Sequence, residues 1–217
     1  MPWQDRPTRV DLALLGAIVG VVAFGLALRP VKPFLLASHP VALAFLTGDL
    51  VPIGAAAAFA RTGETPLWPV VLAGAIGMVK FDWLTWWTGR QWGEGIIKMF
   101  TTSQRVLRFA GRATELAPWI LRVAVLLAVL PGVPTAVVYA MAGWARMRLG
   151  VFLLLDLAGA LIMTGLIAGL GYWSGQRAVN VVLLVDKYAS VVSLSMIGIA
   201  LVIPLIKRWI RPTGAGR

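Results

Sequence analysis

Five charged residues lie inside or next to long apolar stretches of this chain, and their chemistry raises the first question about function. They are Asp49, Lys80, Asp82, Arg122 and Asp156. An ionisable side chain near the centre of a membrane costs about 2.5–3.5 kcal/mol on insertion scales, so it needs a partner, a wet cavity or a function. We therefore take these five as candidates for transport or proton coupling.

Asp49 occurs in the sequence TGDLVP, where a glycine and a proline interrupt an apolar run. No basic residue adjoins it in the sequence, and a desolvated carboxyl group there is suited to bind and release a proton during transport. The alternative is that Asp49 caps the following helix by accepting hydrogen bonds from backbone N–H groups. The two roles are compatible.

The other four charges are expected at one depth, in the cytoplasmic half of the membrane. Lys80 and Asp82 are two residues apart, so on a helix they point to different faces and do not neutralise each other. We expect Lys80 to pair with Asp156, and Asp82 to pair with Arg122. The alternative to a transport role is that these ion pairs only hold the helices together.

The composition identifies the kind of protein that must position these charges. The chain has 217 residues, of which 59% are hydrophobic and 13% charged, and its mean hydropathy is +0.83. This excludes an ordinary soluble domain and indicates an integral membrane protein. Four segments are long and apolar enough to span a bilayer; they are residues 11–29, 68–88, 149–173 and 187–206.

Two further apolar segments, 34–62 and 119–145, are interrupted in the middle. The interruptions are TGDLVPIG and LPGVPT, and their tip residues are Gly48, Pro52, Gly54, Pro131, Gly132 and Pro134. Each segment then leaves two arms too short to span, which indicates a re-entrant helical hairpin; a full span with a proline kink is the alternative. With a cytoplasmic N-terminus, the re-entrant arrangement places most Lys and Arg residues and the C-terminus in the cytoplasm, as the positive-inside rule requires.

The predicted fold class is therefore an all-α integral membrane protein in one polytopic domain, 1–217. It contains about four transmembrane helices and two re-entrant helical hairpins in an inverted repeat, with the hairpin tips lining a path. Segment 91–117 alternates basic and apolar residues, which predicts a cytoplasmic, interfacial amphipathic helix; a solvated basic loop is the alternative.

The sequence FDWLTWWTGRQWG at 81–93 resembles the D-x-x-x-Y/W-x-x-G-R-x-x-G signature of the DedA family of VTT-domain membrane proteins. Asp82, Gly89, Arg90 and Gly93 occupy its fixed positions. Residues 130–175 are similar to the second half of that family. The resemblance implies paired re-entrant hairpins in inverted repeat and a role in moving lipids between leaflets, as in undecaprenyl-phosphate recycling or phosphatidylethanolamine translocation.

One departure from the family pattern concerns the second hairpin. Many bacterial members carry two arginines around its tip, whereas Val129 and Thr135 stand at about those positions here. Another lipid, or scrambling without an energy source, is therefore compatible with the resemblance.

The function expected from these features is a lipid translocase of the plasma membrane, the inner membrane of a bacterium. It would act like a flippase or scramblase on a phospholipid or polyprenyl-phosphate headgroup, with proton coupling as one form of the hypothesis. The alternatives are a secondary transporter of a small solute or ion, and a membrane assembly factor that transports nothing. A homo-oligomer is compatible with the sequence.

No enzyme, cofactor, metal or nucleic-acid role is expected. The chain has no cysteine and one histidine, so it lacks the residues of a thiolate metal site or a Ser–His catalytic pair in a G-x-S-x-G setting. The net charge of +11 is assigned to the cytoplasmic flanks of the spans rather than to nucleic-acid binding. The expected partners are membrane lipids and protons.

Overall fold

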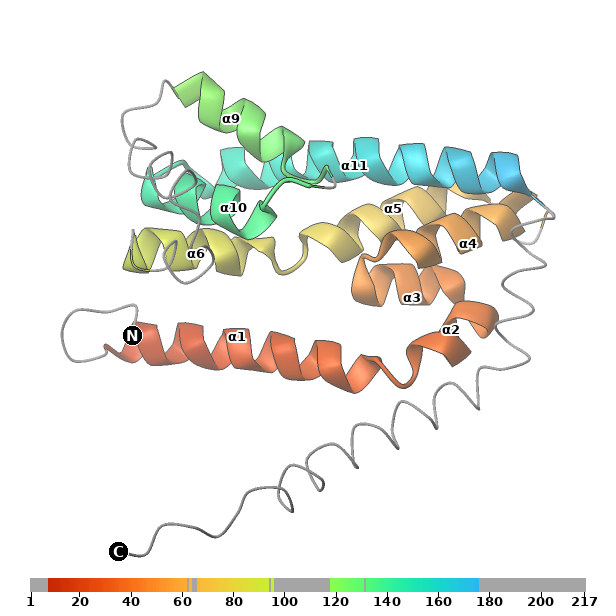
Figure 1. Ribbon diagram of the computed structural model, residues 1–217, viewed down its shortest axis with the longest axis horizontal. Helices are drawn as coiled ribbons and strands as arrows, with labels where there is room; N and C mark the ends of the chain where they lie inside the picture. Colours follow the sequence, from red (N-terminus) through yellow and green to blue (C-terminus); the bar gives the residue numbers. More distant parts are fainter. Residues whose placement is uncertain are drawn as a thin grey trace, which may run out of the picture.

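The computed structural model describes residues 8–61, 63, 66–93, 95, 118–130 and 132–175. Within these residues the regular secondary structure is entirely helical, which confirms the predicted all-α class. The helices, shown in Figure 1, are α1 (Arg9–Leu28), α2 (Lys32–Ser38), α3 (Pro40–Thr47), α4 (Leu50–Arg61), α5 (Leu67–Val79), α6 (Asp82–Trp92), α9 (Pro118–Leu127), α10 (Thr135–Trp144) and α11 (Leu149–Ser174).

Three stretches of the described chain are long and apolar enough to cross a membrane. They are α1, the stretch Leu67–Trp92 that comprises α5 and α6, and α11. These stretches coincide with three of the predicted spans, at 11–29, 68–88 and 149–173. The fourth predicted span, 187–206, and almost all of the predicted amphipathic segment 91–117 beyond the end of α6 lie outside the described residues.

The span predicted at 68–88 was expected to be one helix. In the structure this stretch consists of two helices, α5 and α6. A turn at Lys80 and Phe81 separates α5 from α6. The side chain of Lys80 reaches the carbonyl groups at the end of α3. The turn between α5 and α6 therefore lies where Lys80 contacts the C-terminal end of α3.

The first interrupted segment contains α2, α3 and α4, and the chain reverses direction between α3 and α4 (Figure 1). Gly48 makes this turn with a φ of +68°, in the left-handed region that favours glycine. A Cβ atom at Gly48 would lie 2.6 Å from the carbonyl carbon of Gly77 in α5. Glycine is required here by both its backbone conformation and its close neighbour.

The second interrupted segment also reverses direction, between α9 and α10 (Figure 1). Thr135 helps to close this turn because its hydroxyl group donates a hydrogen bond of 2.8 Å to the carbonyl oxygen of Ala128. Gly132 adopts a φ of +95° in the same turn. Each reversal is followed along the chain by a long apolar stretch, first α5–α6 and then α11.

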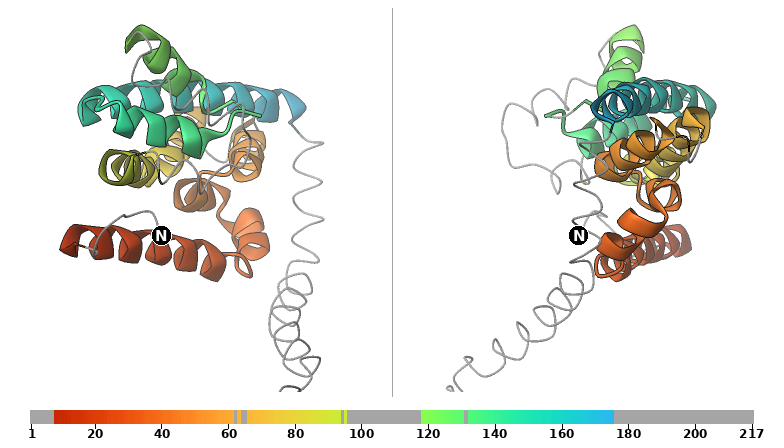
Figure 2. Two further views of the ribbon diagram at one scale, coloured as in Figure 1. Left: turned by 60° about the vertical axis from the view of Figure 1, so that its left-hand side comes forward. Right: turned by 90° about the vertical axis from the view of Figure 1, so that its right-hand side faces the viewer.

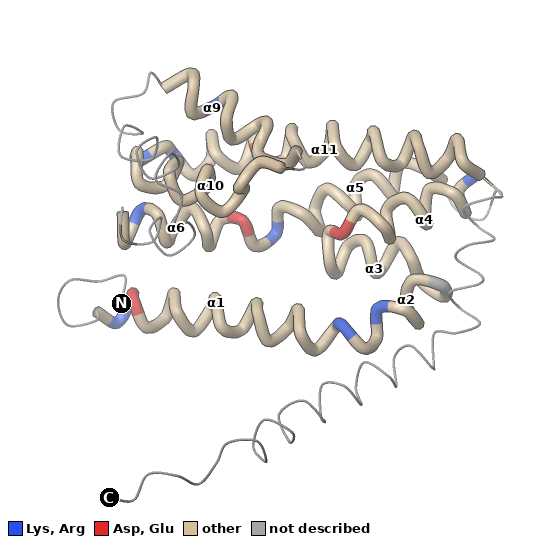
Figure 3. The backbone as a smooth tube through the Cα atoms, viewed as in Figure 1, with Lys and Arg blue, Asp and Glu red and all other residues tan. Residues whose placement is uncertain are grey.

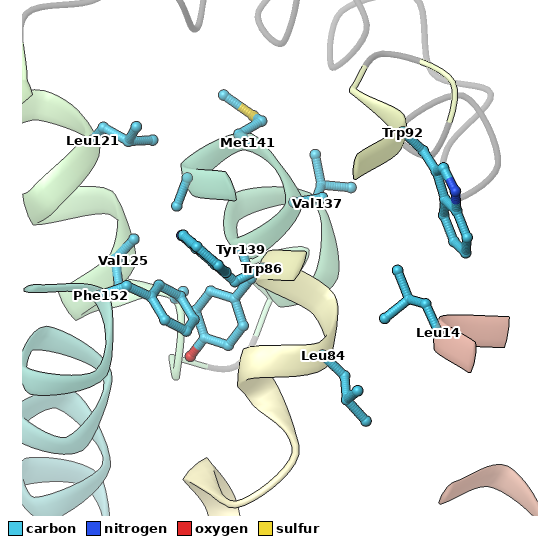
Figure 4. Close-up of a cluster of buried hydrophobic side chains, with 13 residues drawn as sticks. Leu14, Leu84, Trp86, Trp92, Leu121, Val125, Val137, Tyr139, Met141 and Phe152 are labelled. Carbon is cyan, nitrogen blue, oxygen red and sulfur yellow. The ribbon is translucent and has the colours of Figure 1, made fainter. Parts of the chain in front are cut away.

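Helix α11 joins the two parts of the bundle, because it packs against α4 and α5 at one end and against α9 at the other (Figures 1 and 2). Helices α6 and α10 cross at very short range. Gly89 faces the backbone of Ala140, and Gly143 faces the backbone of Trp86, so neither position has room for a Cβ atom. The surrounding buried cluster, drawn in Figure 4, draws residues from α1, α6, α9, α10 and α11.

Helix α1 lies along one side of this bundle (Figure 2), and the start of α1 contacts the end of α6. Asp11 forms a capping box with Thr8 at the start of α1. Its Oδ1 atom also accepts hydrogen bonds from Gln91 Nε2 at 3.0 Å and from Trp92 Nε1 at 2.8 Å. One buried carboxylate thus both starts α1 and fixes its position against α6.

Candidate functional site

Charged residues are sparse along the described helices, with long uncharged stretches between them (Figure 3). One group of them lines a pocket of about 380 Å³ between α1 and the turns that follow α3 and α5. Apolar residues of α1, among them Val22 and Leu26, form one wall of this pocket. Its charged lining residues are Arg29, Lys32, Asp49 and Lys80; we call this cavity the basic pocket.

Asp49 lies at the first chain reversal and forms an ion pair across the basic pocket. Lys32 Nζ lies 2.5 Å from Asp49 Oδ2, and both side chains are partly exposed. Among the described residues Asp49 accepts no hydrogen bond from the backbone of α4. A capping side chain commonly accepts a hydrogen bond from the N–H group three residues later, but that residue is Pro52, which has no N–H group. The carboxylate is therefore an ion-pair partner rather than a helix cap in this conformation.

The side chain of Lys80 binds backbone carbonyl groups at the end of α3 and forms no ion pair with a carboxylate among the described residues. Its ammonium group donates hydrogen bonds to the carbonyl oxygens of Phe45, at 2.7 Å, and Leu46. The centroids of the aromatic rings of Phe24, Phe45 and Phe81 lie 5.2–6.0 Å from its Nζ atom. The expected ion pair with Asp156 is not formed, because the C-terminal carbonyl groups of a helix attract the same cation.

The second charged group lies in the helix bundle. It consists of the carboxyl groups of Asp82 on α6 and Asp156 on α11, together with the neighbouring hydroxyl group of Tyr139 on α10. Asp156 is 2% exposed, and its Oδ1 atom accepts a hydrogen bond of 2.5 Å from the Tyr139 hydroxyl group. The Tyr139 ring packs edge-on against Phe152, with 5.0 Å between the ring centroids (Figure 4). The Asp82 carboxyl group lies beside that of Asp156 and interacts with it electrostatically.

The expected pairing of Asp82 with Arg122 is also not formed. Arg122 lies on the exposed face of α9 and makes no ion pair within the described part of the chain. The structure thus brings Asp82 and Asp156 together and separates each of them from its expected basic partner. The pairings differ from the prediction because hydropathy does not determine the rotation of each helix about its axis.

Three residues of these sites were missed by sequence reasoning. Arg29 and Lys32 are not among the candidates predicted from the sequence, although they lie at and just after the end of the predicted span 11–29. Tyr139 was passed over, although it is a polar aromatic residue in the apolar run TAVVYAMAG, where a buried hydroxyl group needs a partner.

The signature residues near the end of α6 serve the α6–α10 contact. Gly89 lies at the close crossing with α10, and Gly93 ends α6 with a φ of +55°. The guanidinium carbon of Arg90 lies 5.3 Å from the centroid of the Trp86 ring. These three residues help to position α6. Asp82 is the signature residue that belongs to one of the two charged groups.

None of the described tip residues lines the basic pocket: those of the first reversal pack against other helices, whereas Gly132 and Pro134 are exposed. Pro52 is buried in α4, and the carbonyl oxygen of Gly54 packs against Gly171 in α11. Pro134 precedes α10, and a Cβ atom at Gly132 would meet nothing within 4 Å. Pro131 lies outside the described residues.

Comparison with known proteins identifies the family of this chain. The VTT domain matches residues 40–173, which extends from the start of α3 almost to the end of α11. No curated protein and no solved structure matches the chain. The match covers more than half of the sequence and includes both chain reversals, Asp49 and Lys80 of the basic pocket, and the group of Asp82, Tyr139 and Asp156. With its three apolar stretches, this chain is consistent with a multi-pass membrane protein, and it belongs to the DedA family, whose defining domain is the VTT domain.

Proposed function

We propose that this protein is a lipid translocase of the plasma membrane, which moves the headgroup of a phospholipid or polyprenyl phosphate from one leaflet to the other. The observation that carries the proposal is the basic pocket. It combines three basic side chains and one carboxylate with an apolar wall contributed by α1. The proposed activity makes and breaks no covalent bond.

The charge of the basic pocket favours an anionic headgroup. Arg29, Lys32 and Lys80 contribute three positive charges and Asp49 one negative charge, which leaves an excess of two positive charges. Phosphate oxygens accept short, charge-assisted hydrogen bonds from such side chains. The apolar residues of α1 supply a surface that acyl or polyprenyl chains can follow while the headgroup occupies the pocket.

The Lys32–Asp49 ion pair is suited to act as a gate. A phosphate group that enters the basic pocket competes with Asp49 for the Lys32 ammonium group. Protonation of Asp49 would release Lys32 for the phosphate, which provides a route to proton coupling without another acidic group in the pocket. This arrangement would replace the arginines that many relatives carry around the second hairpin.

The proposed path uses the two chain reversals as re-entrant hairpins in an inverted repeat, with both termini in the cytoplasm. The turns at Gly48 and at residues 128–134 support this arrangement, because each joins two short apolar helices and is followed by a long apolar stretch. In a membrane, such turns are tolerated where protein or a wet cavity covers them.

A leaflet-exchange assay on the purified protein in proteoliposomes tests the proposal. We expect Lys32→Gln to lower the flux of a fluorescent anionic phospholipid roughly tenfold or more, because it removes a charge-assisted hydrogen bond to the headgroup. Arg122→Gln, an exposed charge outside the pocket, is the matched control and should leave the flux unchanged.

Two outcomes would overturn the translocase proposal. The first is the absence of flux for phospholipids and polyprenyl phosphate in protein whose fold is verified by circular dichroism. The second is an equal flux in the wild type and in Lys32→Gln. Uptake of a small ion without lipid flux would assign the scaffold to a secondary transporter instead.

A further inference from the structure

The group formed by Asp82, Tyr139 and Asp156 is separate from the basic pocket, none of whose lining residues belongs to it. Its members come from α6, α10 and α11, so three helices meet at this point. Tyr139 and Asp156 are each 2% exposed. The carboxyl group of Asp156 and the hydroxyl group of Tyr139 are therefore enclosed in an otherwise apolar part of the bundle, and Asp82 is half-buried beside them.

The hydrogen bonds of Asp156 are incomplete. Its Oδ1 atom accepts a hydrogen bond from Tyr139, whereas its Oδ2 atom is fully buried and accepts none from the described residues. Burying a polar atom without a partner is unfavourable, so native structures rarely leave one unsatisfied. The polar group that faces Asp156 besides Tyr139 is the carboxyl group of Asp82, which can donate a hydrogen bond only when it carries a proton.

No basic side chain within the described chain compensates the two carboxyl groups. The cations on the helices packed against α11 lie elsewhere; they are Arg61 on α4, Lys80 at the α5–α6 turn, Arg90 on α6 and Arg122 on α9.

Three of these cations have partners of their own. Arg61 donates hydrogen bonds to the carbonyl oxygens of Tyr172 and Trp173, and Lys80 donates to those of Phe45 and Leu46. Arg90 lies over the Trp86 ring. Among the described residues no hydrogen bond or ion pair joins Asp156 to a basic side chain.

We propose that Asp82 and Asp156 form a proton-binding site, in which the two carboxyl groups hold one proton between them. Asp82 carries the proton and donates a hydrogen bond to Asp156 Oδ2, while the Tyr139 hydroxyl group donates one to Asp156 Oδ1. This arrangement satisfies both oxygens of Asp156 and avoids two negative charges side by side, one buried and one half-buried. Because the two carboxyl groups interact, the proton belongs to the pair.

The proton then determines whether α6 and α11 stay in contact at this point. With the proton bound, a hydrogen bond joins the two helices. With the proton lost, two carboxylates in a poorly hydrated environment repel each other. Asp82 follows the first chain reversal, and Tyr139 and Asp156 follow the second, so the bound proton links the two similar parts of the fold.

Infrared spectroscopy of the purified full-length protein in lipid nanodiscs tests the site directly. At neutral pH we expect a C=O stretching band of a protonated carboxylic acid in the wild type. The band should be lost in Asp82→Asn and in Asp156→Asn. In either variant the introduced amide can donate the hydrogen bond to the remaining carboxylate, which then needs no proton. Tyr139→Phe should retain the band at a shifted frequency, because the pair keeps its proton but Asp156 loses a donor.

Asp49→Asn is the matched control, since Asp49 is paired with Lys32 and should not contribute to the band. Circular dichroism establishes that each variant is folded. The proposal fails if folded wild-type protein has no such band, or if the band survives both Asp82→Asn and Asp156→Asn. It also fails if sodium chloride removes the band when choline chloride at the same concentration does not, because the site then binds sodium. None of these results depends on whether lipid is transported.

Discussion

At the scale of single residues, the charged side chains of this protein are held by contacts that differ in kind. Asp49 pairs with a lysine, Lys80 binds backbone carbonyl groups, and Asp156 accepts a hydrogen bond from a tyrosine. Each contact compensates a charge or polar group that an apolar environment would otherwise penalise. The effect of a substitution therefore depends on which partner it leaves behind.

Lys80 provides a test of this view through stability. We expect Lys80→Met to lower the free energy of unfolding by about 1–3 kcal/mol, because the last carbonyl groups of α3 lose their donor and the aromatic rings lose their cation. Thermal denaturation in detergent, followed by circular dichroism, measures the effect. Lys80→Arg keeps the charge and the donors and should recover most of the loss; equal losses in both variants would contradict the role of the charge.

At the scale of elements, the helices of the bundle are positioned by close contacts at a few points. The crossing of α6 and α10 leaves no room for a Cβ atom at Gly89 or Gly143. The attachment of α1 depends on the hydrogen bonds of Asp11 to Gln91 and Trp92. These contacts set where α6 lies, and α6 carries Asp82.

The α6–α10 crossing should tolerate no side chain. We expect Gly89→Ala to destabilise the protein by about 1–3 kcal/mol or more, because the added methyl group meets the backbone of Ala140 and must move α10 away. Gly165→Ala is the control: the position lies in α11 and a Cβ atom there would meet nothing within 4 Å, so alanine should be neutral or stabilising. Equal melting temperatures of the two variants would argue against a tight crossing.

The attachment of α1 can be tested at Asp11. Asp11→Ala removes the capping box and two hydrogen bonds to α6, so we expect a loss of about 2 kcal/mol or more in the free energy of unfolding. Asp11→Asn retains an acceptor oxygen and should lose less. A cysteine cross-link between α1 and α6, formed more slowly in Asp11→Ala, would show that α1 detaches; an unchanged rate would contradict this account.

At the scale of the whole molecule, the two chain reversals produce two similar units, each a pair of short helices followed by a long apolar stretch. Helix α11 packs on both units, and the Asp82–Asp156 contact joins them. The basic pocket lies on the side of the bundle that α1 covers.

The orientation of the first unit in the membrane is open to a direct measurement, because the chain contains no cysteine. We expect single cysteines at positions 32 and 61 to react with a membrane-impermeant thiol reagent from the same side of intact cells. Both positions flank the first interrupted segment, and a re-entrant segment returns to the side from which it entered. Labelling from opposite sides would show that the segment spans the membrane.

The sequence by itself determined the membrane class, the helical content, three of the apolar stretches and the two points where the chain reverses. Length, hydropathy and the positions of Gly48, Pro52 and Gly132 suffice for these features, because they act locally along the chain. The family followed from the spacing of Asp82, Gly89, Arg90 and Gly93. These predictions needed no knowledge of which helices become neighbours.

Only the tertiary structure decided the partners of the charged residues. The sequence predicted Lys80 with Asp156 and Asp82 with Arg122, whereas the fold pairs Asp49 with Lys32 and brings Asp82 next to Asp156. The physical reason is that hydropathy fixes the depth of a residue but not the rotation of its helix. That rotation is set by packing at a few close contacts, such as the α6–α10 crossing, between residues far apart in the chain.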